Sequence, residues 1–115
     1  EMVFVTGYHV DKRPVYTMPD EEHPPRTHSF DLLFRGVEIT TGGQRIHDYA
    51  QLVESLRSAG VNPDDYAGYL EAFRCGMPPH GGMGMGIERL TKQFLGLDSI
   101  KSASLFPRDR YRLSP

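Results

Sequence analysis

Residues 29–45 read Ser-Phe-Asp-Leu-Leu-Phe-Arg-Gly-Val-Glu-Ile-Thr-Thr-Gly-Gly-Gln-Arg. Two strand-like runs, 29–34 and 37–41, flank Arg35-Gly36, and a two-residue connection with Gly in second place is typical of a tight β-hairpin. In that register Asp31 and Glu38 are diagonal neighbours on one face of the hairpin. Two carboxylates placed in this way can share a bridging cation.

The hairpin is preceded by further strand-like and loop-like sequence. The apolar run Met2–Thr6 predicts a buried strand, and residues 15–18 predict a second, shorter one. The polar, Pro-rich stretch 19–27 predicts a loop.

Three helices are expected after the hairpin. Asp48 is a predicted N-cap for a helix that ends at Gly60, and Asn62-Pro63 opens another that ends at Gly76. The apolar stripe expected on this second helix consists of Tyr66, Tyr69, Leu70 and Phe73. The third helix follows a glycine-rich strand and ends at Gly96. Strands, two helices, a strand and a helix in this order predict an α+β fold, in which helices flank an antiparallel sheet.

The glycine-rich strand carries the clearest sign of a binding site. Gly82, Gly84 and Gly86 occupy every second position, so one face of the strand has no side chains and a flat ligand can lie against it. The helix that follows offers free N–H groups to a phosphate, and Arg89 adds a guanidinium. These features suit a nucleotide. The alternative is that the glycines only allow neighbouring elements to pack closely.

Composition and charge exclude several classes of protein. The 115 residues suffice for one small domain, and a net charge of −2 provides no basic field for nucleic acid. Cys75 has no second cysteine to pair with, and no run of about 18 apolar residues could span a membrane. We therefore expect a cytoplasmic protein without membrane contact. The apolar run at the very start suggests a chain cut ahead of a strand, the alternative being a processed terminus.

Two stretches resemble a known family. The run Gly82-Met83-Gly84-Met85-Gly86-Ile87-Glu88-Arg89 resembles motif 3 of class II aminoacyl-tRNA synthetases. Residues 30–48 resemble the segment that precedes motif 3 in aspartyl-tRNA synthetases, especially of the archaeal type. Residues 105–109 and 112–115 resemble the C-terminal end of that family.

The resemblance implies roles for individual residues. It places Glu38 at ATP and Mg²⁺, and Arg45 at the side-chain carboxylate of aspartate. Thr41 stands where the family commonly has Ser, near both the metal and the amino acid. The implied ATP-binding residues are Glu38, Gly86, Ile87, Glu88 and Arg89, the aspartate-binding residues are Thr41 and Arg45, and the metal ligands are Asp31, Glu38 and Thr41. No residue is implied as a catalytic acid or base, because activation depends on positioning and charge.

Strand alternation conflicts with these roles, since it sends Thr41 and Arg45 to the face opposite Glu38. A β-bulge or twist near Gly42-Gly43 would return them to one face. The histidines lack metal-ligand spacing with Cys75, so no zinc site is expected.

The resemblance also implies what the chain lacks. Motifs 1 and 2 and the anticodon-binding domain have no counterpart, so residues 1–115 correspond to the C-terminal portion of the catalytic domain and are expected to be inactive alone. The longer enzyme would bind the acceptor end of tRNA and form a homodimer. The alternatives are an asparaginyl-tRNA synthetase, a synthetase-like paralogue, or a non-enzymatic module that binds a nucleotide or another protein.

Overall fold

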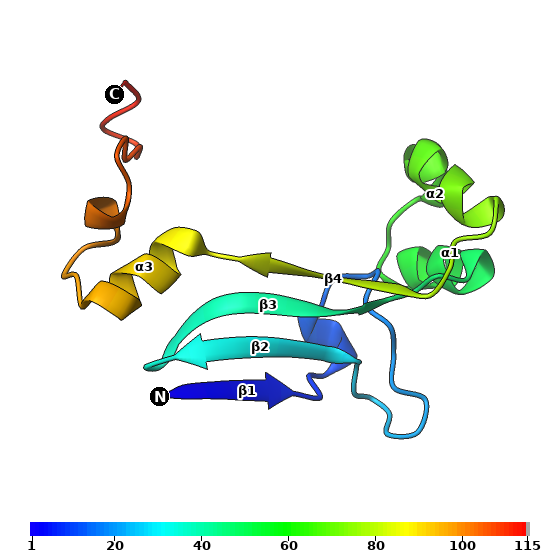
Figure 1. Ribbon diagram of the computed structural model, residues 1–115. Helices are drawn as coiled ribbons and strands as arrows, with labels where there is room; N and C mark the ends of the chain where they lie inside the picture. The colour runs from blue at the N-terminus through cyan, green and yellow to red at the C-terminus, as the bar shows by residue number, and fades with distance from the viewer. Residues whose placement is uncertain (115) are drawn as a thin grey trace. The chain divides into compact units, whose positions relative to one another are not determined.

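A computed structural model describes residues 1–114; Pro115, at the end of the tail that carries part of the resemblance, lies outside them. The chain forms the antiparallel sheet and helices expected of an α+β fold, with strand order β1-β2-β3-β4 (Figure 1). The strands are β1 (Met2–Thr6), β2 (Ser29–Phe34), β3 (Val37–Arg45) and β4 (His80–Met85). The α-helices are α1 (Tyr49–Ser58), α2 (Ala67–Arg74) and α3 (Ile87–Leu95), and three short 3-10 turns are η1 (Val10–Lys12), η2 (Pro63–Tyr66) and η3 (Ile100–Ala103).

The described residues form two compact units. The first contains residues 1–5, 31–41 and 84–114, and the second contains residues 6–30 and 42–83. The units interleave in the sequence, because each of the four strands continues from one unit into the other.

The predicted hairpin between β2 and β3 is confirmed. Arg35 and Gly36 have φ angles of 50° and 80°, the positive values that a type I′ turn requires at both central positions. Gly36 adopts such a value without strain, whereas for Arg35 it is unusual. The Arg35 guanidinium donates a hydrogen bond to the Gln93 carbonyl (2.9 Å) in the last turn of α3, so the turn also binds a helix end.

The register of the hairpin changes before β3 ends. A two-residue turn places Gly43 opposite His28, but it is the N–H of Gln44 that donates to the His28 carbonyl (2.8 Å). Between the turn and this bond β3 therefore has one residue more than β2, which is a β-bulge. A Cβ on Gly43 would lie 2.6 Å from the His28 carbonyl oxygen, and one on Gly42 would lie 2.8 Å from that of Gly82. Only glycines fit here, which supports the distortion expected at this pair.

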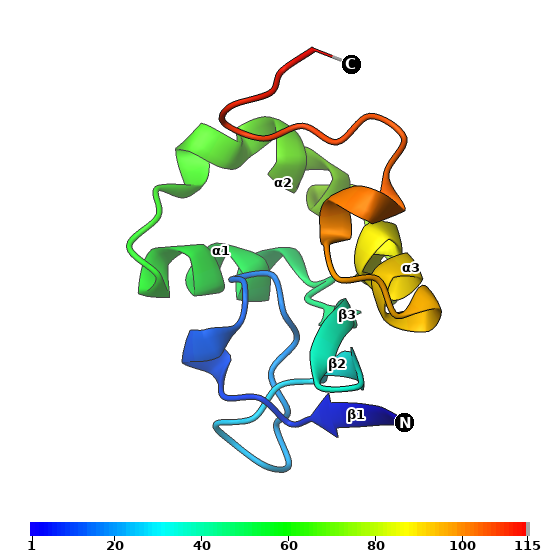
Figure 2. The same ribbon diagram turned by 90° about the vertical axis from the view of Figure 1, so that its left-hand side faces the viewer.

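The core of the second unit lies between its two helices and the end of β3. It consists of Ile46, Leu52, Val53, Leu56, Leu70 and Phe73. The Asp48 carboxylate accepts a hydrogen bond from the Gln51 N–H (2.8 Å), so the predicted N-cap of α1 is confirmed. Figure 2 shows α1 and α2 as the two green helices of this unit.

Three local predictions need correction. The second predicted helix begins as the 3-10 turn η2, and Tyr66 and Tyr69 of its apolar stripe are half exposed. β1 forms, but its four apolar residues are 37 to 65% exposed, because β1 is an edge strand. Residues 15–18 do not form a strand: the Thr17 N–H closes a turn onto the Pro14 carbonyl (2.9 Å), and Thr17 only bridges to Arg45.

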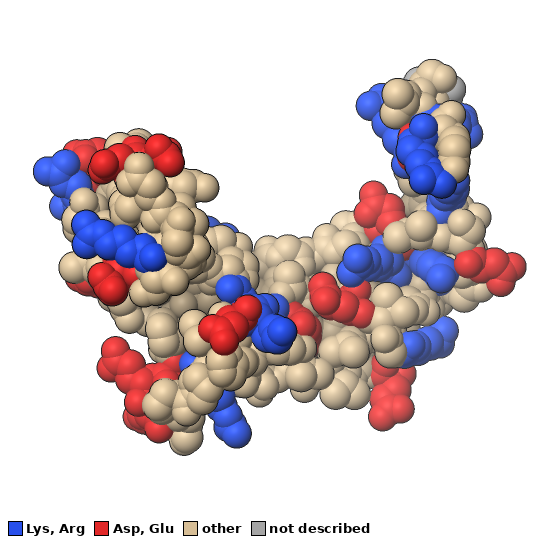
Figure 3. All heavy atoms as spheres, turned by 180° about the vertical axis from the view of Figure 1, so that it is seen from behind, with Lys and Arg blue, Asp and Glu red and all other residues tan. Residues whose placement is uncertain are grey.

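The basic tail after α3 folds around one carboxylate. Arg108, Arg110 and Arg112 make this end of the chain rich in positive charge, and blue spheres gather over it in Figure 3. Asp109 pairs with Lys101 of η3 and accepts hydrogen bonds from the N–H groups of Tyr111 (2.7 Å) and Arg112 (2.9 Å). The Lys101 hydrogen bond, with help from these N–H groups, lowers the pKa of Asp109.

This arrangement predicts how the tail responds to acid. Because the pKa of Asp109 is lowered on folding, the carboxylate stabilises the tail above the unfolded pKa of about 3.9, and that stabilisation is lost as the pH falls through the folded pKa. Lys101→Met should raise the pKa of Asp109, as measured by NMR titration of its side-chain carbonyl. Lys92→Met is the control and should leave it unchanged; equal shifts in both variants would show that Lys101 is not the cause.

Among the residues that the structure describes, no helix is long and apolar enough to cross a membrane.

Candidate functional site

Arg45, at the end of β3, packs against an aromatic ring and a glycine. Its guanidinium carbon lies 5.2 Å from the centre of the Tyr16 ring, within the range of a cation–π contact. A Cβ built on Gly82 would lie only 3.0 Å from Arg45 Nη2, so the guanidinium occupies the space that a side chain at this position of β4 would need. No carboxylate of residues 1–114 forms an ion pair with Arg45. Its charge is therefore available to an anionic ligand.

The first turn of α3 is tied to β3 within the first unit. The Gly86 N–H donates to the Ile39 carbonyl (2.8 Å), and Arg89 Nη1 donates to the Glu38 carbonyl (3.0 Å). Arg89 Nη1 also lies 3.7 Å from Glu38 Oε1, in an ion pair whose side chains are about half exposed. The structure thus brings together two residues that the sequence assigned to ATP.

The N-terminus of α3 has the donors that a phosphate needs. Its N-cap is Gly86, and no side chain caps the helix. The first N–H groups of a helix have no partner within it, and the helix dipole favours an anion there. Ile87, Glu88 and Arg89, which the sequence assigned to ATP, are the residues that carry these groups. Glu88 would repel a phosphate from the same turn, and a cation or Arg89 would have to offset that charge.

Gly82 and Gly84 on β4, and Gly86 just after it, have different surroundings. The space beside Gly82 is filled by the Arg45 guanidinium, and a Cβ on Gly86 would lie 3.3 Å from Cδ of Arg89. Gly84 alone has nothing within 4 Å of where its Cβ would lie. Two arginine side chains therefore occupy much of the strand face that the sequence predicted to be bare. The alternative, that the glycines allow neighbouring groups to pack closely, is correct in part.

The predicted metal ligands are oxygen donors on paired strands. Asp31 on β2 is buried, whereas Glu38 and Thr41 on β3 are exposed. Carboxylate and hydroxyl oxygens suit Mg²⁺, which usually takes one or two carboxylates and completes its shell with water and substrate phosphate. Residues 1–114 contain no group of three or more His, Cys, Asp or Glu that could hold a metal by themselves. With one or two carboxylates, these residues would need water and substrate phosphate to complete the shell of such an ion.

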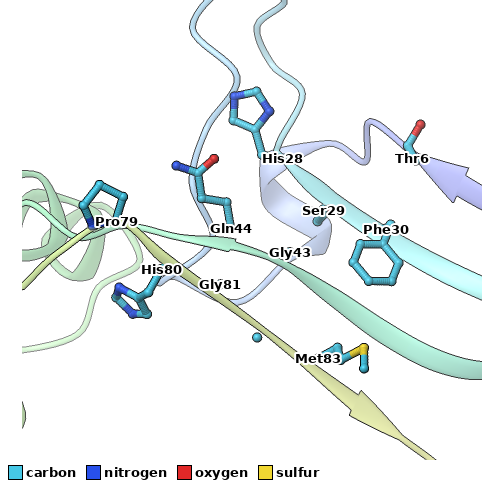
Figure 4. Close-up of a pocket in the computed structure, with 11 residues that line it drawn as sticks. Thr6, His28, Ser29, Phe30, Gly43, Gln44, Pro79, His80, Gly81 and Met83 are labelled. Carbon is cyan, nitrogen blue, oxygen red and sulfur yellow. The ribbon is translucent and has the colours of Figure 1, made fainter.

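A hollow of about 670 Å³ lies in the second unit, and sequence analysis did not find it. Figure 4 shows Phe30 and Met83 at one end of it and His28, Gln44 and His80 toward the other. Gln44 lines the hollow and its neighbour Arg45 does not, which is consistent with side chains that alternate between faces. No acidic or basic residue other than histidine lines it, so it has no donor set for the charged groups of ATP or aspartate.

Three comparisons with known proteins show what this chain is similar to. The family model of class II tRNA synthetases (D, K and N) matches residues 1–110. The chain is 56% identical over 115 residues to an aspartate–tRNA(Asp/Asn) ligase of Thermus thermophilus, and covers 27% of that protein. It superimposes on an aspartyl-tRNA synthetase of Entamoeba histolytica with a TM-score of 0.94 at 43% identity, and on an asparaginyl-tRNA synthetase of Pyrococcus horikoshii with a TM-score of 0.92 at 40% identity. These alignments cover 99% of this chain and 24% and 28% of the two solved chains.

The chain thus spans about a quarter of the length of the relatives that it matches.

Proposed function

This chain belongs to the class II tRNA synthetases of the D, K and N group, and from that membership we propose that it is the C-terminal portion of the catalytic domain of an aspartate–tRNA ligase. The longer enzyme activates aspartate with ATP and transfers it to tRNA. The observation that carries the choice of amino acid is Arg45, a guanidinium without a carboxylate partner among the described residues. A planar fork of N–H donors is suited to the side-chain carboxylate of aspartate.

The ATP-binding part of the proposal rests on the first unit. Glu38 and Arg89 are in contact, and Gly86, Ile87 and Glu88 form the uncapped start of α3 beside them. Glu38, with Asp31 and Thr41, would hold Mg²⁺ on the phosphates, and Arg89 would contact the nucleotide directly. Bound Mg²⁺ supplies positive charge that offsets the charge of the triphosphate.

The aspartate-binding part rests on Arg45, with Thr41 as the second residue. The β-bulge before Gln44 supports this role for Arg45, because it reverses side-chain alternation there; Thr41 precedes the bulge and keeps the alternation predicted from the sequence. The proposal further includes the acceptor end of tRNA as a partner, a homodimeric enzyme and a cytoplasmic location. Residues 1–115 alone would be inactive.

A second candidate is an asparaginyl-tRNA synthetase, because a solved enzyme of that name has nearly the same backbone over this chain. Gln44-Arg45-Ile46-His47 and the tail at residues 106–109 look more like the aspartyl branch. The 56% identity to an aspartate ligase also exceeds the 40% identity to that asparaginyl enzyme.

A chimera tests the function. This chain should replace the matched quarter of the Thermus thermophilus relative, and the purified chimera should be assayed for amino-acid-dependent ATP–pyrophosphate exchange. We expect exchange with aspartate and not with asparagine, as for the unmodified relative assayed in parallel. Exchange with asparagine instead would favour the second candidate, and a folded chimera without exchange would favour a non-enzymatic module.

A further inference from the structure

The Arg45 guanidinium is held by two residues that neither the sequence motifs nor the proposed function assigns to aspartate. A Cβ on Gly82 would lie 3.0 Å from Nη2, 3.3 Å from Cζ and 3.4 Å from Nε. These three distances are nearly equal, so the guanidinium turns its face, rather than an edge, toward Gly82. The Tyr16 ring contacts the same group, with 5.2 Å between its centre and Cζ.

Backbone pairing fixes Tyr16 relative to Arg45. The Ile46 N–H donates to the Tyr16 carbonyl (2.8 Å), and the Met18 N–H donates to the Gln44 carbonyl (3.0 Å). These two bonds flank the bridge between Thr17 and Arg45. The turn that carries Tyr16 is therefore attached to β3 on both sides of Arg45, which fixes the backbone from which the ring extends.

Gly82 lies against the face of the guanidinium, which leaves the N–H groups, lying in its plane, to other partners. An arginine side chain is otherwise flexible, and holding its plane in advance reduces the entropy lost when a carboxylate binds. A second carboxylate near Arg45 would compete with the ligand, but residues 1–114 provide none within ion-pair distance.

We propose that Tyr16 and Gly82 are positioning residues, which orient the Arg45 guanidinium and thereby set the preference of the enzyme for a carboxylate over a carboxamide side chain. This inference rests on the proposed function, because it requires that Arg45 binds the side chain of aspartate. It adds a prediction that Arg45 alone does not make: changes beside the guanidinium, with Arg45 intact, alter the choice of amino acid.

Tyr16 variants of the chimera provide the first test. Tyr16→Leu removes the ring and should raise the Michaelis constant for aspartate by about fivefold to tenfold, the scale of a cation–π contact. The Michaelis constant for ATP should stay unchanged, and the preference for aspartate over asparagine, measured as the ratio of kcat/KM values, should fall by a similar factor. Tyr16→Phe keeps the ring and should restore the behaviour of the parent.

A Gly82 variant provides the second test. The Cβ of Gly82→Ala would stand 3.0 Å from Nη2 of Arg45, so the guanidinium must shift. A shift of this kind should reduce kcat/KM for aspartate by about tenfold or more. Gly68→Ala on α2 is the matched control, because nothing lies within 4 Å of where that Cβ would be. It should leave both Michaelis constants unchanged and should not lower the melting temperature, since Ala favours a helix more than Gly does.

The outcomes separate the two proposals. If Arg45→Ala weakens the binding of aspartate but Tyr16→Leu and Gly82→Ala do not, the positioning role is wrong and the proposed function stands. If Arg45→Ala itself leaves aspartate unaffected, the proposed function loses its main support. A fall in melting temperature with equal losses for aspartate and ATP, or a Tyr16→Phe variant as impaired as Tyr16→Leu, would likewise overturn the positioning role.

Discussion

Arg45→Ala in the chimera is expected to raise the Michaelis constant for aspartate by about 30-fold to 1,000-fold. The variant removes a charge-assisted, bidentate pair, which contributes about 2 to 4 kcal/mol when it is shielded from water, and each 1.4 kcal/mol corresponds to about tenfold in affinity. The Michaelis constant for ATP should change little, because Arg45 belongs to the aspartate part of the proposal. Steady-state exchange kinetics with each substrate varied separately measure both values.

Two further variants make this test specific. Arg45→Lys keeps the charge but not the planar fork, so it should recover only part of the lost affinity. Arg57→Ala removes a cation from the exposed face of α1 and should leave aspartate binding unchanged, which controls for the loss of positive charge. Parallel increases in the Michaelis constants for aspartate and ATP after Arg45→Ala would show that the assigned role is wrong.

The second large effect is expected at the start of α3. Arg89→Ala should lower the affinity for ATP by about tenfold to 100-fold at every Mg²⁺ concentration, since a hydrogen bond to a charged group contributes about 1.5 to 3 kcal/mol. Glu38→Gln should instead lower affinity for Mg²⁺–ATP and move the activity optimum to higher Mg²⁺. A neutral amide is a weaker ligand than a carboxylate for this hard cation.

A Mg²⁺ titration of both variants of the chimera separates these roles. Arg89 also donates to the Glu38 carbonyl (3.0 Å), so melting temperatures must show that Arg89→Ala still folds. Lys92→Ala, one turn further along α3, is the control for lost positive charge on this helix. An unaltered Mg²⁺ optimum in Glu38→Gln would contradict the metal role of Glu38 and leave Asp31 or another part of the enzyme to bind the ion.

Local sequence signals predicted most element boundaries. The two-residue turn at Arg35-Gly36, the Asp48 cap of α1 and the glycine that ends α3 lie where the sequence placed them. Each signal acts over a few residues: a turn needs positive φ, a cap needs a side-chain acceptor, and a helix end favours the left-handed Gly96. None of them depends on how distant parts of the chain pack.

The predictions that failed concern burial and strand pairing, which depend on contacts with distant segments of the chain. The apolar pattern of β1 predicted burial, but its edge position leaves it exposed. Residues 15–18 have strand-like side chains, but the turn that follows Pro14 prevents a strand. The apolar stripe of the second helix was half correct, because Leu70 and Phe73 face α1 and the core while Tyr66 and Tyr69 do not.

By itself the sequence determined the α+β class, the hairpin, the helix caps and, through motif 3, the family. Only the tertiary structure decided that Gly82 accommodates Arg45, that Tyr16 lies beside Arg45, and that Glu38 pairs with Arg89. The physical reason is that these pairs are distant in the sequence and meet only after strands pair. A one-residue bulge in β3 then determines which way the Arg45 side chain points. Strict alternation along the sequence does not predict such a bulge.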